Sequence, residues 1–358
     1  MLSLSNISDG IHNWLNETFN PTWAMVLEML LAGLAVIGLF ATLGLVLVLM
    51  ERKVAAWMQI RLGPNRVGPK GMLQSAADTV KLLVKEGMTP NGVDKFLFNL
   101  APFIAMIVAM LLMAPIAFAK NFALWDLNIG VLYITAVSSI TVISILMAGW
   151  ASNNKYSLMG AMRSGAQIVS YELSAGLSIL TIIVFTGTLN VSEIVLSQAD
   201  GWWIFKGHLP ALISFIIFII AVTAETNRAP FDLAEAESEL TAGFHTEYSG
   251  MKFALFFLAE YINVFIVCAL GATLFFGGWM PFHIGNWEAF NHAMDYIPSS
   301  LWFFGKTFFL IFVIMWFRWT FPRLRIDQLL TLEWKYLLPI SMFNLLLATA
   351  IAIAGWHF

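Results

Sequence analysis

Acidic side chains cluster in one stretch of this sequence, and two more acids lie in or beside long apolar runs. Residues 225–252 hold six acids and two basic residues: Glu225, Asp232, Glu235, Glu237, Glu239 and Glu247 against Arg228 and Lys252. Glu172 lies at the start of one apolar run, and Glu260 lies about two turns into another. Grouped carboxylates repel one another and poor hydration disfavours their charged form, so some would hold protons near neutral pH and all would titrate as a set. That behaviour suits a proton relay.

These acids also admit structural explanations. An acid at mid-membrane costs roughly 2.5–3.5 kcal/mol, so Glu260 marks either an ion path or a hydrogen-bonded structural acid. A run of like charge is normally a solvated loop, but large apolar side chains interrupt this run and favour a packed segment. On a helix, Glu239 would share a face with Glu235, and Asp232 precedes Glu235 by three residues. The interrupting side chains are Phe231, Leu233, Leu240 and Phe244.

A second informative stretch precedes the second apolar run. Residues 61–69 mix glycine and proline with Arg61 and Arg66, which predicts a fixed turn. Apolar residues then recur at helical spacing over residues 72–86, with Asp78 and Lys81 on the other face. Such a helix lies in the membrane interface. It is either a peripheral anchor or a frame for a lipophilic ligand that enters from the membrane.

The composition identifies the elements that must position these side chains. The chain has 358 residues, 59% hydrophobic and 11% charged, with a mean hydropathy of +0.78, whereas soluble domains carry roughly 25% charged residues. A soluble enzyme is excluded. We predict an all-α polytopic membrane protein with about eight transmembrane helices and one amphipathic interfacial helix, because a bilayer core requires roughly 20 apolar residues per helix. The predicted spans are 23–50, 96–119, 131–150, 169–186, 209–224, 253–276, 301–317 and 336–354.

The basic residues predict the orientation of these spans. Of the 19 Lys and Arg residues, 16 fall in or beside alternate loops on one side, and three fall on the other. Loops with an excess of Lys and Arg face the cytoplasm. Residues 1–22 would then form an outer segment, residues 23–358 a single membrane domain, and both termini would face outward. The acidic loop 225–252 would be cytoplasmic, against the basic trend of that side.

Cysteine and histidine exclude several cofactors. Cys268 is the only cysteine, and the six histidines lie outside or at the ends of the apolar runs. Cys-ligated zinc, an iron–sulfur cluster and a haem held between facing helices are therefore not expected. We predict that this chain binds no metal and no electron carrier.

Six strings in order resemble a known family: Glu51 to Val54, Gln59 to Gly68, Ser170 to Glu172, Ala224 to Leu233, Glu237 to Leu240 and Glu247 to Gly250. They resemble the H-subunit family of bacterial NADH:quinone oxidoreductase, respiratory complex I, whose mitochondrial counterpart is NADH dehydrogenase subunit 1. The similarity runs from about residue 24 to the last span and includes Arg323 to Gln328. The resemblance implies a bacterial inner-membrane protein that forms most of the quinone tunnel beside the hydrophilic arm.

The same resemblance implies roles for residues and partners. Arg61, Arg66, Asp78, Lys81, Arg228, Phe231 and Phe244 would line or frame the quinone chamber. The proton relay would comprise Glu172, Glu225, Asp232, Glu235, Glu237, Glu239, Glu247 and Glu260. Quinone would be the substrate, while FMN, NADH and the iron–sulfur clusters would belong to partner subunits. The expected partners are the other complex I subunits, quinone and membrane lipid, with no nucleic acid.

The sequence also leaves two alternatives open. One is the corresponding subunit of a membrane-bound, energy-converting hydrogenase, which need not bind quinone. The other is a stand-alone cation/proton antiporter. The lack of a repeat between the two halves and of an acid pair at the middle of facing spans argues against the antiporter.

Overall fold

A computed structural model of the chain describes residues 12–18, 20–120, 122–233, 237–283 and 287–355. Within these residues, eight helices are long and apolar enough to cross a membrane, which confirms the predicted fold class. The elements are α2 (Pro21–Met58), η1 (Pro69–Gly71), α3 (Gln74–Val84), α4 (Lys95–Leu112), β1 (Ala117–Ala119), β2 (Phe122–Ala123), α5 (Gly130–Ser138), α6 (Ile140–Ala151), α7 (Lys155–Thr186), α8 (Val191–Leu196), α9 (Trp203–Lys206), α10 (His208–Glu225), α11 (Glu237–Leu240), η2 (Gly243–His245), α12 (Gly250–Phe275), α13 (Glu288–Asp295), α14 (Ser299–Thr320), α15 (Ile326–Thr331), η3 (Leu332–Leu337) and α16 (Leu338–Ile353).

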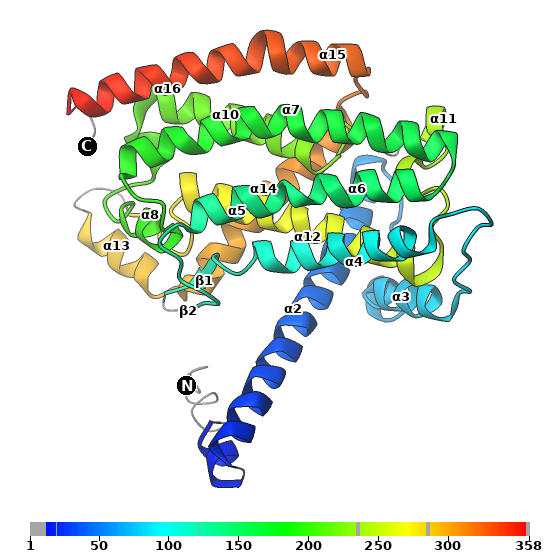
Figure 1. The fold of residues 1–358 in the computed structure, drawn as a ribbon. Helices are drawn as coiled ribbons and strands as arrows, with labels where there is room; N and C mark the ends of the chain where they lie inside the picture. The colour runs from blue at the N-terminus through cyan, green and yellow to red at the C-terminus, as the bar shows by residue number, and fades with distance from the viewer. Residues whose placement is uncertain (1–11, 19, 121, 234–236, 284–286, 356–358) are drawn as a thin grey trace.

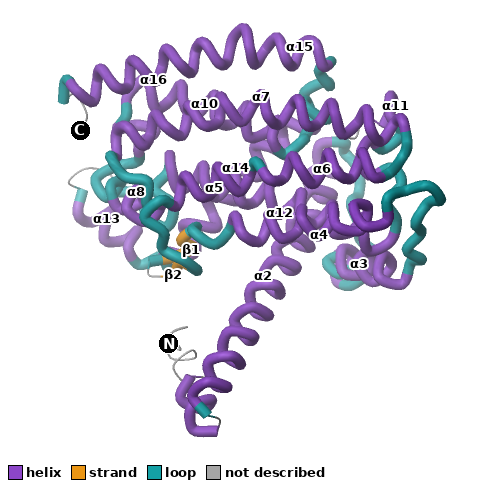
Figure 2. The backbone as a smooth tube through the Cα atoms, in the orientation of Figure 1, coloured by secondary structure: helices purple, strands orange, loops and turns teal. Residues whose placement is uncertain are grey.

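Most of the long helices run side by side, and their connections gather at two ends (Figures 1 and 2). The elements α3 and α11 lie at one end, and α8, α13 and the β1–β2 hairpin lie at the other, where α16 also ends. The first long helix is different. The C-terminal part of α2 packs against α12 and α14, while its N-terminal half diverges from the bundle and exposes apolar side chains such as Trp23 and Leu34.

Four helix boundaries differ from the predicted spans by seven residues or more, beginning with α2, which ends at Met58 instead of 50. The predicted second span ends at residue 119, but α4 ends at Leu112, since Pro115 disfavours a helical residue before it and the short hairpin follows. The fourth span begins at Lys155 instead of 169, where the Asn154 side chain accepts the Tyr156 N–H at 3.0 Å and caps a polar first section. The last span begins at Ile326 instead of 336.

The turn before α3 is fixed, as predicted. The Lys53 ammonium of α2 donates to the Pro64 carbonyl at 2.6 Å and the Lys70 carbonyl at 2.8 Å. Gly71 has a φ of +77°, and a Cβ there would lie 2.1 Å from the Pro64 carbonyl oxygen, so the loop can close only on glycine. This closure sets the direction in which α3 begins.

Helix α3 is shorter than the predicted 72–86, and its apolar face is the exposed one. Ser75 is buried where α3 packs against α2 and α12. Leu73, Val80 and Val84 are 55%, 58% and 81% exposed. In a membrane protein such a face can contact lipid, a partner or a lipophilic ligand.

The acidic loop is packed, as its apolar side chains predicted. Phe231, Leu233, Leu240 and Phe244 are all at most 9% exposed. The expected helical alignment of its acids is only partly realised. Helix α11 begins at Glu237, so Asp232 lies outside it in irregular backbone, and Glu235 lies outside the described residues.

Candidate functional site

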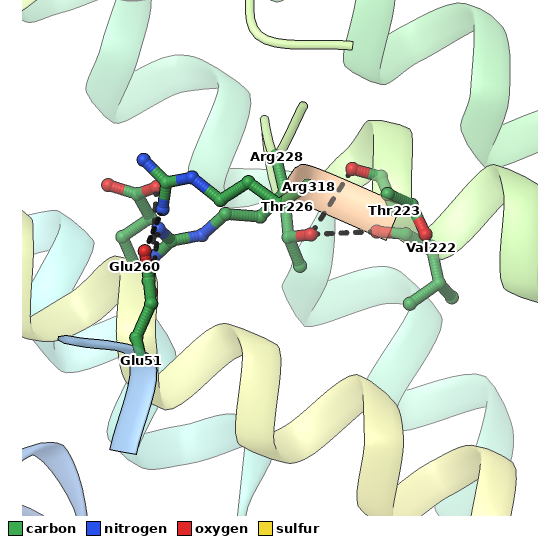
Figure 3. Close-up of polar contacts among 7 residues, drawn as sticks. All are labelled: Glu51, Val222, Thr223, Thr226, Arg228, Glu260 and Arg318. Carbon is green, nitrogen blue, oxygen red and sulfur yellow. Dashed lines mark hydrogen bonds and ion pairs between the residues drawn. The ribbon is translucent and has the colours of Figure 1, made fainter. Parts of the chain in front are cut away.

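Four charged side chains from four separate segments meet inside the bundle, and we call them the ion cluster: Glu51 of α2, Arg228 of the loop after α10, Glu260 of α12 and Arg318 of α14 (Figure 3). The Arg228 guanidinium lies 3.3 Å from one Glu51 oxygen and 3.4 Å from a Glu260 oxygen. Arg318 donates to the other Glu51 oxygen. Two carboxylates therefore balance two guanidiniums in a site where Glu51 and Arg228 are 7% and 5% exposed.

The end of α10 directs Arg228 into this cluster. The Thr226 hydroxyl donates to the carbonyls of Val222 and Thr223 at 3.0 and 3.3 Å (Figure 3). Asn227 then takes a left-handed φ of +50°, which asparagine tolerates better than most residues. The Arg228 guanidinium carbon lies 4.3 Å from the centre of the Tyr261 ring, a cation–π contact that adds to its two ion pairs.

A cavity of two adjoining chambers lies beside the ion cluster, and carboxyl, hydroxyl and amide groups line it among a majority of apolar side chains. The first chamber has a volume of about 80 Å³ and is lined by Glu172 and Glu225; the second has about 50 Å³ and is lined by Glu225 and Glu260. Each volume admits water molecules, since one water requires roughly 10–15 Å³ measured in this way. Five residues line both chambers: Thr141, Ile168, Glu225, Thr226 and Asn263.

The cavity collects three of the predicted relay acids from three helices. Glu172 of α7 accepts a hydrogen bond from the Ser139 hydroxyl, at the one-residue break between α5 and α6. Glu225 ends α10, and Glu260 joins the second chamber to the ion cluster. The buried Asn263 Oδ1 has no hydrogen-bond partner among the described residues, which leaves an acceptor on a side chain that lines both chambers.

Among the remaining predicted relay acids, the three whose side chains the structure describes line neither chamber: Asp232, Glu239 and Glu247. Asp232 pairs with Arg323 at 3.2 Å, and the exposed Glu239 pairs with Arg163 at 2.7 Å. Glu247 accepts from the Asn154 amide at 2.5 Å. Glu237 is the first residue of α11, and Glu235 lies outside the described part of the chain.

The predicted quinone-chamber residues lie in four different places. Arg61, Arg66 and Lys81 are exposed near α3, and the Arg61 Nε donates to the Gln59 amide oxygen at 2.6 Å. Phe244 lines the second chamber, next to Phe256. Phe231 instead packs on the Tyr171 ring, with a centroid distance of 5.4 Å. Arg228 belongs to the ion cluster.

Asp78 anchors α3 to α2. Its carboxylate accepts a hydrogen bond from Arg52 and lies 3.4 Å from the Lys81 ammonium. Partial burial favours the neutral acid, but the hydrogen bonds and positive charge of Arg52, and then of Lys81, outweigh it and hold the pKa of Asp78 below its ordinary value.

This depressed pKa predicts how the docking of α3 depends on pH. The stabilisation from Asp78 is complete above the ordinary aspartate pKa of about 3.9 and is lost as the pH falls through the lower, folded-state pKa. Amide exchange of α3 should therefore stay slow down to about pH 3.9 and accelerate below it. The Asp78→Asn variant should exchange faster at neutral pH and lack this step; an identical step in the variant would assign it to another group.

Sequence reasoning missed two members of the ion cluster. Glu51 entered only as part of a motif, and Arg318 only as one of the positive charges that set the orientation. Both lie near helix ends, where a charge is ordinarily solvated. The sequence feature that could have predicted their ion pair is that Glu51 and Arg318 bear opposite charges on the same predicted side of the membrane.

The expectation of no metal on this chain remains a prediction. Among the residues that the structure describes, no three His, Cys, Asp or Glu side chains come together in a way that could hold a metal ion.

Comparison with known proteins identifies the family. A family model described as NADH dehydrogenase matches residues 31–349. The chain belongs to this family. Relatives named as the H subunit of NADH-quinone oxidoreductase include that of Bacteroides thetaiotaomicron, 56% identical over the whole of both chains. Those of Brevibacillus brevis, 48% identical over 93% of this chain and 96% of the relative, and of Rickettsia bellii, 50% identical over 86% and 88%, carry the same name.

Membership of the NADH dehydrogenase family confirms the resemblance drawn from the six motifs. It agrees with the eight apolar helices of a multi-pass membrane protein.

Proposed function

We propose that the chain is, like these relatives, a membrane subunit of NADH–quinone oxidoreductase, and that it couples quinone reduction to proton movement. The observation that supports the coupling is the cavity beside the ion cluster, where Glu172, Glu225 and Glu260 line two adjoining chambers. Neutral and charged forms of such carboxyls interconvert when a nearby charge changes. Glu260 connects the carboxyls of the cavity to such charges, because it lines the second chamber and also pairs with Arg228 of the ion cluster.

The quinone enters, in this proposal, beside α3. Its exposed apolar face offers a surface to an isoprenoid tail, while Asp78 and Lys81 stand on the polar side. The Lys53 hydrogen bonds hold the turn that carries Arg61 and Arg66 in one conformation. A preorganised frame of this kind lowers the entropic cost of ordering a ligand.

The relay requires a driver outside this chain. Moving one charge against the membrane potential costs about 2.3 kcal/mol per 100 mV. The partners of this proposal supply it: subunits of the hydrophilic arm that hold FMN, the iron–sulfur clusters and the NADH site. The chain would lie in the bacterial inner membrane, with the α3 and α11 end toward the cytoplasm and both termini outside.

Added bulk on the exposed face of α3 tests the quinone frame. Ala77→Phe should raise the apparent KM for quinone, or reduce sensitivity to a quinone-site inhibitor, several-fold, because Ala77 is exposed beside the apolar face of the helix. Ala350→Phe makes the same change at an exposed position of α16 and should leave these kinetics unchanged. Unaltered quinone kinetics in a fully assembled Ala77→Phe complex would favour the plain membrane anchor.

Two acids with different surroundings test the relay. Glu172→Gln should impair proton pumping, and usually quinone reduction with it, with assembly intact, because Glu172 lines the first chamber. Glu239→Gln should have the smaller effect, since Glu239 is 57% exposed and paired with Arg163. Proton uptake by vesicles during NADH oxidation measures the pumping rate of each variant. Normal pumping in both variants would remove the support for a carboxyl relay.

A further inference from the structure

A buried carboxyl group lies outside the two-chamber cavity, on the last membrane span. Glu333 is fully buried and belongs to η3, a segment with π-helical hydrogen bonding in which the Leu338 N–H donates to the carbonyl of Glu333, five residues earlier. π-Helical turns are rare and occur frequently at functional sites. Apolar and aromatic residues surround this part of the bundle: Tyr171, Ala175, Leu329 and Leu337.

Helix α7 provides the contacts of Glu333. The Ser174 hydroxyl donates to one carboxyl oxygen, and the other oxygen is buried without a hydrogen-bond partner in the described chain. Tyr171 is the titratable side chain of α7 that faces Glu333, and its hydroxyl donates to the Leu329 carbonyl at 3.1 Å. The neighbouring Trp334 indole donates to the Ser170 hydroxyl at 3.3 Å. Three residues of α7 thus form hydrogen bonds with η3 and with α15 just before it.

No cation balances Glu333 within the described residues. Lys335 follows on the same segment but is exposed, with its ammonium 5.9 Å from the Tyr336 ring centre. Glu51, by contrast, is almost as buried and has two guanidinium partners. A buried carboxylate without a partner is so costly that the group takes up a proton instead.

We propose that Glu333 holds a proton at neutral pH and forms a second proton-binding site of this protein, on the face of α7 opposite Glu172. Ser174 and Glu172 are two residues apart, which places them about 200° apart around an α-helix. One rigid helix therefore touches the cavity on one side and Glu333 on the other. A movement of α7 that alters the surroundings of Glu172 also moves the hydroxyl bound to Glu333, so the hydrogen bonding of the Glu333 carboxyl group changes during turnover.

Infrared spectroscopy of the whole complex in membranes tests the site directly. The wild type should show the carbonyl stretch of a protonated carboxyl group at neutral pH, sensitive to D₂O, and Glu333→Gln should lack it. Ser174→Ala should shift this band to higher frequency, because the carbonyl loses its hydrogen bond. Ser178→Ala is the matched control one turn along α7; its hydroxyl donates to the Ala175 carbonyl at 2.7 Å, so the band should not move.

The outcomes separate this site from the relay. If neither Glu333→Gln nor Ser174→Ala alters a protonated-carboxyl band at neutral pH, Glu333 does not hold the proposed proton. If the Glu333→Gln complex does not assemble, the Ser174→Ala spectrum alone decides the assignment. The change during turnover rests on the proposed function: the band should shift when quinone is reduced, and an unchanged band would overturn the link between α7 movement and Glu333. Loss of the relay in Glu172→Gln would leave the static band in place.

Discussion

Replacing Arg228 with methionine should leave little assembled, quinone-reducing complex in the membrane. The substitution keeps most of the side-chain volume but removes the charge shared by Glu51 and Glu260. Breaking a buried ion pair by deleting one partner costs about 3–5 kcal/mol, because the remaining charge stays buried without compensation. The amount of this chain in the purified complex and the rate of NADH-driven quinone reduction measure the effect.

Two matched variants show whether burial causes this loss. Arg163→Met removes the ion pair with the exposed Glu239, and such surface pairs contribute about 0–1 kcal/mol, so assembly should remain near the wild-type level. Arg228→Lys keeps the charge but lacks the forked guanidinium that reaches two carboxylates. The amount of assembled complex should therefore lie between those of the wild type and Arg228→Met. Wild-type amounts of active complex with Arg228→Met would contradict the structural importance of the ion cluster.

Glu225→Gln should reduce proton pumping at least about tenfold while the complex still assembles. Glutamine has nearly the same shape but cannot accept and release a proton, and proton transfer by a positioned side chain contributes roughly 10²–10⁴-fold to a rate. The effect should exceed that of the other acids because Glu225 lines both chambers. Proton uptake by vesicles during NADH oxidation provides the measurement.

A remote acid serves as the control for Glu225. Glu193 lies on α8, near the opposite end of the bundle from α11, and its side chain accepts a hydrogen bond from Thr188. Glu193→Gln should pump at the wild-type rate. Pumping by Glu225→Gln at that same rate would mean that the cavity carries no protons.

The sequence predicted the acids of the cavity because their position conflicts with their polarity. Glu172 and Glu260 lie where charge is expensive, and Glu225 opens an acidic loop on the basic side of the protein. The sequence did not predict which side chains contact these acids. Arg228 and Glu51 are 177 residues apart, and hydropathy does not reveal that α2 and the end of α10 meet.

Helix α3 shows a second limit of sequence patterns. Its periodicity correctly predicts one apolar and one polar face, but not which of them packs against the protein. The polar face docks, with buried Ser75 and the Arg52–Asp78 ion pair at the contact, and the apolar face is left outside. In a soluble protein the opposite arrangement would be expected, since water would then drive the apolar face inward.

The most direct test of the coupling proposal compares pumping by Glu172→Gln, Glu225→Gln and the double variant. The effects of substitutions on a single proton path are strongly non-additive, because a second block adds little once the path is already interrupted. The double variant should therefore pump no more slowly than the slower single variant. Losses that multiply in the double variant would contradict a single path through the cavity.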